Sequence, residues 1–286
     1  MAAVAARTVF RVSIGAIMTF QICALFARSA LDASLVGNGT DPAVANDLSY
    51  LIVPPILAVL MYPCLKQHRH VLAGLLATRH LGLRLCCFAV LLGILLRVTW
   101  WSVLTVLIWM GLVRSGEPDA IVGPHFAFDC PPPSVLGLSL FIMAILIPLI
   151  EEVINRGFLL HALLAKGALV SVVVSSCLFA IMHRPESYIP AFVIGIFLGV
   201  QCLSSRTLWA PILTHAAYNA AATFHWDCFQ IIWNPPEGDP ALAAAGRIAA
   251  PVAVAGILIC CFLVSKKAIG APSPRSPARS SGKSAR

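Results

Sequence analysis

Residues 150–156 read IEEVINR, and they place two adjacent carboxylates and an arginine inside one of the most apolar stretches of the chain. The chain has 286 residues, of which 59% are hydrophobic and only 11% are charged. A soluble domain is usually close to half apolar and a quarter charged. The composition therefore predicts a protein that folds in a lipid bilayer, and the three charges within it need a separate explanation.

Apolar runs of about 20 residues, the length that crosses a bilayer as a helix, indicate the fold. We expect an all-α, polytopic membrane helical bundle with about eight transmembrane helices. The expected limits are 9–31, 48–65, 85–112, 135–165, 168–183, 187–203, 207–225 and 242–264. Pro54 and Pro55 are expected to break the second helix. The first run also fits a signal peptide, but its length and the lack of a small-x-small cleavage site favour a retained helix.

Basic residues gather in the loops that would lie on one side of such a bundle. They are Arg7, Arg11, Lys66, Arg69, Arg79, Arg84, Lys166, Arg206 and the six cations of the tail from Lys266 onward, which contains no acid. Basic loops stay on the cytoplasmic side, so both termini are expected there. We expect the tail to be disordered and to meet anionic lipid, not nucleic acid.

The three charged residues of the quoted stretch differ in the ion-pair or hydrogen-bond partners that the sequence offers them. Glu152 and Arg156 are four residues apart, which suits an ion pair on one helix face. Glu151 lies about 100° around the helix and has no local counter-ion. Asn155 shares the face of Glu151 and could hydrogen-bond to it. Because ionisable groups within membrane helices are costly, Glu151 is a candidate functional residue.

Three further polar residues recur in the helices that follow. His183 ends the fifth expected helix, and His215 and Asn219 are four apart on one face of the seventh. At 1.5 Å per residue, Glu151 lies roughly 22 Å from the cytoplasmic edge, Asn219 roughly 18 Å and His215 roughly 12 Å. The similar depths predict that these side chains converge within the bundle.

Two chemistries suit this set of side chains. In one, Glu151 and His183 take a proton from water, and His215 with Asn219 stabilises the oxyanion that forms on a peptide carbonyl. In the other, Glu151, His183 and His215 bind zinc and leave a position open for water. Neither H-E-x-x-H nor G-x-S-x-G is present in the sequence. From the residues alone, both chemistries stay open.

Three motifs stand in order along successive helices, and they read Glu151-Glu152-x-x-x-Arg156, Phe179-x-x-x-His183 and His215-x-x-x-Asn219. This order resembles the CPBP intramembrane protease family, which includes the CAAX prenyl endopeptidases and bacterial relatives. The resemblance covers roughly residues 135–225. Each motif alone is weak, but three in this order are specific.

The resemblance implies an intramembrane endopeptidase of the glutamic type that needs no cofactor, with a zinc enzyme as the alternative. It implies that Glu151 is the general base, His183 assists it, and His215 and Asn219 stabilise the oxyanion. Glu152 and Arg156 would shape the site. The implied substrate is a membrane-anchored or lipid-modified protein, and the implied location is a bacterial inner membrane.

The resemblance also suggests a division of the chain. Residues 1–134 would form N-terminal membrane helices of unclear role, 135–225 the catalytic core, 226–265 an outer loop and the last membrane helix, and 266–286 the basic tail. The alternative function is that of a non-catalytic membrane protein. Such a protein would bind a peptide or partner, or would transport a solute with Glu151 and the histidines as a proton relay.

A few further residues allow predictions that do not depend on the candidate site. Gly195 and Gly199 form a G-x-x-x-G pattern that predicts close helix packing. Arg97 either lines the substrate path or extends toward the membrane surface. The ten cysteines contain no C-x-x-C pair and are expected to be mostly buried thiols, with one alternative, a bridge between Cys130 and Cys228.

Overall fold

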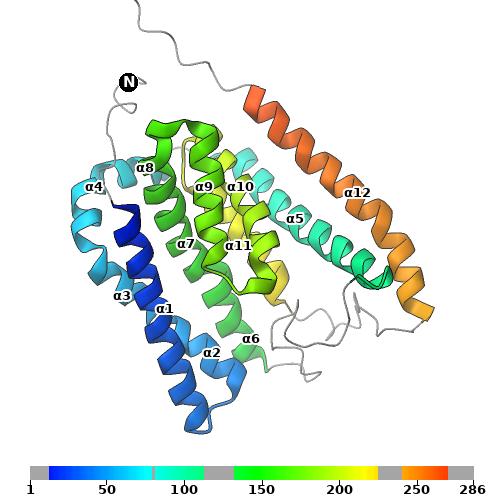
Figure 1. Cartoon of the computed structure of the whole chain (residues 1–286), viewed down its shortest axis with the longest axis horizontal. Helices are drawn as coiled ribbons and strands as arrows, with labels where there is room; N and C mark the ends of the chain where they lie inside the picture. The colour runs from blue at the N-terminus through cyan, green and yellow to red at the C-terminus, as the bar shows by residue number, and fades with distance from the viewer. Residues whose placement is uncertain (1–12, 79–80, 113–131, 225–239, 270–286) are drawn as a thin grey trace, which may run out of the picture.

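The computed structural model describes residues 13–78, 81–112, 132–224 and 240–269 (Figure 1). Within these ranges the secondary structure is helical and contains no strand. The elements are α1 (Ile14–Gly37), α2 (Pro42–Tyr50), α3 (Val53–Leu60), α4 (Tyr62–Leu75), α5 (Leu83–Trp109), α6 (Pro133–Leu140), η2 (Phe141–Leu146), α7 (Ile147–Glu152), η3 (Val153–Leu160), α8 (His161–Leu163), η4 (Leu164–Lys166), α9 (Ala168–Ile181), η5 (Pro185–Ser187), α10 (Tyr188–Ser205), α11 (Trp209–Thr223) and α12 (Pro240–Ile269).

The predicted all-α, polytopic bundle is confirmed. Five helices in the described part are long and apolar enough to cross a membrane, and they are Ile14–Gly37, Leu83–Trp109, Pro133–Lys166, Tyr188–Ser205 and Leu242–Leu263. A sixth crossing results if the bent pair Val44–Leu60 and Tyr62–Leu75 counts as one span. α9 and α11 have 14 and 15 residues, which at 1.5 Å per residue is short of a hydrocarbon core about 30 Å thick. The count of eight spans therefore stays a prediction.

The break in the second expected span lies later than the sequence suggests. Pro54 and Pro55 begin α3, where a proline's missing N–H costs little. The sharp bend of 86° comes at Met61, immediately before α4. Lys66 and Arg69, which were expected in a loop, lie on α4 with exposed side chains. The prediction of a loop there is wrong because apolar residues continue at helical spacing through this basic segment.

Three apolar clusters hold the described bundle together, and the smallest joins α5 to α12 through Leu104, Ile108 and Leu242. The largest one joins α1, α3 and α4 to the helix that contains Glu151, through residues such as Ile17, Leu72 and Phe158. The second one joins α5, α9, α10 and α12, with Leu96, Phe179, Leu198 and Cys260 among its members. The polar side chains of the expected site are positioned between elements of the two larger clusters.

Small residues allow the closest helix contacts. A Cβ added at Gly195 would stand 3.0 Å from Ser176 Cβ, and one at Gly199 would stand 3.2 Å from a Val172 methyl group. The predicted close packing at this G-x-x-x-G pattern is confirmed, and its partner is α9. Gly93 of α5 meets α11 more tightly, because a Cβ there would lie 2.3 Å from the carbonyl oxygen of Thr214.

Exposed cations collect at one end of the bundle, where α4 lies in Figure 1. They are Lys66, Arg69, Arg84, Lys166 and Arg206, and the chain topology brings them to the same end. Within the described ranges no acidic residue lies at that end. The turn before α11 is held there because Trp209 Nε1–H donates to the carbonyl of Leu76 at 2.7 Å.

Two expectations concern residues outside the described ranges. These are the alternative bridge between Cys130 and Cys228 and the disorder of residues 270–286 of the tail. The expected disorder of residues 266–269 is wrong, because α12 continues to Ile269. The cysteines that the structure describes are unpaired thiols, among which Cys202 and Cys260 are buried and Cys23, Cys87, Cys177 and Cys261 are exposed. The expectation of mostly buried thiols is therefore only partly met.

Candidate active site

The helix that contains the two glutamates is irregular on both sides of them. Glu151 and Glu152 end the short α7, which lies between the π-helical segments η2 and η3. Pro148 has no N–H to donate to the preceding turn, which is one local reason for the irregular hydrogen-bond ladder. π-Helical segments are rare and occur often at functional sites. Here they set the rotation of the helix on which the carboxylates stand.

Glu152 is the centre of a buried charge network. Its Oε1 accepts hydrogen bonds from Arg156 at 2.9 Å and from His215 Nδ1 at 2.9 Å. Glu152 is fully buried, and the side chains of Arg156 and His215 are 1% and 4% exposed. Arg156 also donates to the carbonyl of Gly195 at 3.1 Å, so it ties the glutamate helix to α10. The predicted ion pair between Glu152 and Arg156 is confirmed.

Glu151 faces the other nitrogen of the same histidine. The separation between Glu151 Oε2 and His215 Nε2 is 3.8 Å, which allows an electrostatic contact but is too long for a hydrogen bond. That oxygen is buried and has no hydrogen-bond partner in the part of the chain that the structure describes. The Glu151 side chain is 30% exposed, unlike that of Glu152. His215 thus lies between a more accessible carboxylate and a buried one, whose Oε1 accepts two hydrogen bonds and whose Oε2 has no partner among the described residues.

The two asparagines near the site have different partners. Asn155 donates to the backbone carbonyl of Glu151 at 2.8 Å, so it braces the helix instead of pairing with the carboxylate as expected. Asn219 donates to the carbonyl of Met143 at 2.9 Å, which fixes α11 against η2. An amide nitrogen has two hydrogens, so one donor of Asn219 remains for another acceptor.

His183 reaches this group through an aromatic ring and makes no hydrogen bond to the glutamates. Its Nδ1–H donates to the carbonyl of Phe179 at 2.8 Å, which leaves Nε2 as the acceptor of the neutral ring. The Phe179 ring contacts the rings of His183 and His215 at centroid distances of 4.6 and 5.8 Å. Arg156 lies 4.6 Å from the centroid of the same ring. Phe179 therefore separates and orients three polar side chains.

A metal site is not assembled from these side chains. In the described ranges, no group of three or more His, Cys, Asp or Glu residues is arranged to hold a metal ion. The alternative zinc set of Glu151, His183 and His215 thus does not fit as a set of ligands in this conformation. Whether the reaction depends on a metal stays a prediction.

The structure places every residue of the expected site around one region, and it adds two that the sequence did not assign. Glu151, Glu152, Arg156 and His215 are linked directly, and His183 joins them through Phe179. Asn219 lies one turn after His215 on α11 and donates to the carbonyl of Met143. Phe179 stands four residues before His183, so the helical spacing indicates their contact. No sequence signal indicates the carbonyl of Met143, because it is a backbone group 76 residues from Asn219.

One comparison with known proteins matches the segment that contains these residues. Residues 133–221 match the family model of the type II CAAX prenyl endopeptidases described as Rce1-like. The matched segment begins at α6, ends within α11 and includes all the residues of the three motifs. The predicted resemblance to the CPBP proteases is confirmed for this segment. Neither a curated protein nor a solved structure matches the chain.

Proposed function

We propose, from the family match over residues 133–221 and from the charge network beside Glu151, that this protein is an intramembrane endopeptidase. Its substrate is a membrane-anchored or lipid-modified protein. The observation that carries the proposal is the Oε2 atom of Glu151, which is buried, without a hydrogen-bond partner and 3.8 Å from His215 Nε2. A carboxylate held in this way suits a general base that binds a water molecule.

Hydrolysis begins with the activation of water. Glu151 takes a proton from the water while the water oxygen bonds to the scissile carbonyl carbon, which gives a tetrahedral intermediate with a negative oxygen. His183 assists by accepting a hydrogen bond from the same water at Nε2, the nitrogen left free by the bond to the Phe179 carbonyl. No covalent bond to the protein forms in this sequence.

His215 and Asn219 stabilise the negative oxygen. The carboxylate of Glu152 accepts a hydrogen bond from His215 Nδ1 at 2.9 Å, which turns Nε2 of the same ring toward Glu151. A proton on this Nε2 then donates to the oxyanion, together with the remaining N–H of Asn219. Arg156 balances the charge of Glu152 and keeps its carboxylate in place. Glu152 and Arg156 are positioning residues and do not touch the substrate.

The intermediate then collapses to products. The carbon–nitrogen bond breaks, and the proton held by Glu151 passes to the departing amine. One water is consumed and one new carboxylate and one new amine are formed. Each group needed for this cycle belongs to the protein or to water, so the proposal requires no cofactor.

We place the protein in a bacterial inner membrane with both termini in the cytoplasm. The integral membrane character follows from the five or six candidate spans. The five exposed cations at the end that contains α4 support the orientation, because basic residues accumulate on the cytoplasmic side. A C-terminal fusion to green fluorescent protein should therefore fluoresce, whereas a dark, exported fusion would reverse the orientation.

The function is tested by comparing the membrane proteomes of cells that produce the native protein or its Glu151→Gln variant. Mass spectrometry of C-terminal peptides should reveal proteins that are trimmed only in the cells with the native protein. Asp41→Asn is the matched control, because it removes an exposed acid far from the site in the chain fold, and it should leave the trimming intact. Identical C-terminal peptides in native and Glu151→Gln cells would refute the proposal.

A further inference from the structure

Arg97 is a charged residue in the middle of a membrane helix, and the site described above does not use it. It stands 14 positions after Leu83 and 12 before Trp109, the two ends of α5. At 1.5 Å per residue, its Cα is about 18–21 Å from either end. An arginine side chain cannot reach a membrane surface over that distance. The expectation that Arg97 extends to the surface is therefore not supported, and the expectation that it lines the substrate path stays a prediction.

The charge of Arg97 is not neutralised within the described ranges. Its guanidinium forms no hydrogen bond and no ion pair there, and its Nε is buried without a partner. Its surroundings are two aromatic rings, with the guanidinium carbon 4.5 Å from the centroid of Trp101 and 5.3 Å from that of Tyr218. Stacking on aromatic rings offsets only part of the cost of an unpaired charge at this depth.

Arg97 contacts α11 at Tyr218, within one turn of two residues of the proposed reaction centre. α5 and α11 are in tight contact at Gly93, and Thr214 of α11 donates to the carbonyl of Ala89 at 3.0 Å. Arg97 is one turn beyond Gly93 on the same helix. Its ring partner Tyr218 directly precedes Asn219 in the sequence and follows His215 by one turn.

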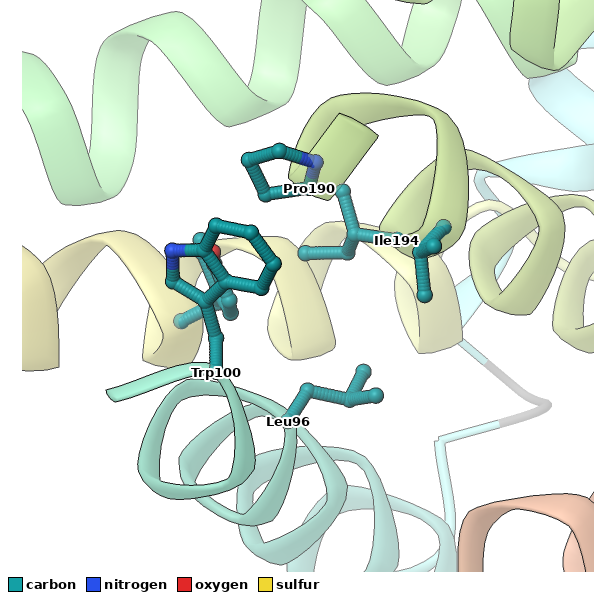
Figure 2. A pocket seen from close by; sticks show the side chains of 6 residues that line it. Leu96, Trp100, Pro190 and Ile194 are labelled. Atoms are coloured by element: carbon teal, nitrogen blue, oxygen red, sulfur yellow. The ribbon is translucent and has the colours of Figure 1, made fainter. Parts of the chain in front are cut away.

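A small apolar cleft adjoins Arg97. It is lined by Leu96, Trp100, Pro190, Val193, Ile194 and Tyr218. Figure 2 shows Leu96 and Trp100 extending from α5 toward Pro190 and Ile194 of α10. Tyr218 belongs both to this cleft and to the aromatic surroundings of Arg97. An apolar segment that enters the cleft would therefore bring its neighbouring groups close to the guanidinium.

We propose that Arg97 binds a carboxylate of the substrate segment that follows the cleaved bond, while the apolar cleft takes a neighbouring side chain of that segment. This rests on the proposed peptidase function. A carboxylate is the anion that a peptide itself provides, and a guanidinium in an apolar environment binds it strongly.

Binding to an inactive variant tests this without any need for cleavage. The probe is a fluorescent peptide with an S-farnesyl cysteine followed by three apolar residues, made with a free C-terminal carboxylate or with a carboxamide. The full-length Glu151→Gln protein in detergent should bind the carboxylate form at least about tenfold more tightly than the amide. Equal affinities, or no binding of either form, would overturn the proposal.

Substitution of Arg97 separates recognition of charge from a structural role. In a Glu151→Gln background, Arg97→Gln should abolish the preference, and Arg97→Lys should keep part of it. Arg84→Gln is the matched control on the same helix, because Arg84 is exposed at its start, and it should keep the full preference. If Arg97 only packed against Trp101 and Tyr218, Arg97→Gln would weaken both peptide forms equally, which would also refute the proposal.

A third peptide identifies the source of the carboxylate. It ends in an amide but has a glutamate as its last residue. If its affinity equals that of the free acid, Arg97 binds the carboxylate of an acidic side chain. If its affinity equals that of the amide, Arg97 binds the carboxylate of the chain terminus. Hydrolysis by the native protein is measured in parallel. A carboxylate preference without any hydrolysis would refute the proposed function and leave only the binding of a carboxylate by Arg97. Hydrolysis without the preference would refute this inference and leave the proposed function in place.

Discussion

The two adjacent glutamates should differ sharply in what they do for stability. Glu152 and its partner Arg156 are 0% and 1% exposed and are joined at 2.9 Å. Removing one member of a buried pair leaves the other charge buried and unpaired, which lowers the free energy of unfolding by about 3–5 kcal/mol. Glu151 is 30% exposed, and its nearest ionisable partner, His215, is 3.8 Å away, so its removal should cost less than about 1 kcal/mol.

These values predict different melting temperatures for two alanine variants. A loss of 1 kcal/mol lowers the midpoint by roughly 2–4 °C in a protein of 150–250 residues. Glu152→Ala should therefore lower the thermal midpoint of the purified protein in detergent by at least about 6 °C, and Glu151→Ala by less than about 4 °C. Both variants should nevertheless lose hydrolysis, because one lacks the base and the other lacks the residue that holds His215.

A double variant tests the cause of the destabilisation. Glu152→Met combined with Arg156→Met replaces the ion pair by apolar side chains, which is often neutral or stabilising at buried positions. It should melt closer to the native protein than Glu152→Met does. Equal midpoints for Glu151→Ala and Glu152→Ala, or a double variant that is no more stable than Glu152→Met, would refute the assignment of Glu152 and Arg156 as a buried pair.

Three further predictions concern the reaction and the packing around it. Asn219→Ala should lower the rate of hydrolysis by about 10²–10³-fold, as the loss of an oxyanion donor does, whereas a transporter that relays protons through Glu151 should retain its transport in this variant. Exhaustive chelation should leave the rate of hydrolysis unchanged, and a loss of rate that zinc restores would establish a metalloenzyme. Gly93→Ala should lower the thermal midpoint, because its new Cβ would stand 2.3 Å from the Thr214 carbonyl oxygen, while Gly137→Ala, with no atom within 4 Å, serves as the control and should not.

Much of the bundle could be predicted from the sequence because lipid imposes long apolar runs. The expected helix at 135–165 and the observed span Pro133–Lys166 differ by two residues or fewer at each end. The ion pair of Glu152 and Arg156 could also be predicted from the sequence, since residues four apart share a helix face. Both inferences use short-range regularities that one helix determines by itself.

Other features depend on contacts between distant segments and could not be predicted in this way. Glu152 and His215 are 63 residues apart, and the spacing within either motif does not indicate that they hydrogen-bond. The bend of 86° at Met61 is different, because Pro63 in the first turn of α4 is a local cause that the expectation of a break at Pro54 and Pro55 did not include. The π-helical segments beside α7 have no reliable pattern in a single sequence.

The most direct test of the central claim is a cleavage assay with the purified protein in liposomes. The substrate is a peptide with an S-farnesyl cysteine followed by three apolar residues, and the products are identified by mass spectrometry. We expect the native protein to release the three-residue product, and the Glu151→Gln variant to do so at least about 10³-fold more slowly. Release at the native rate by Glu151→Gln would contradict the assignment of Glu151 as the base that activates water.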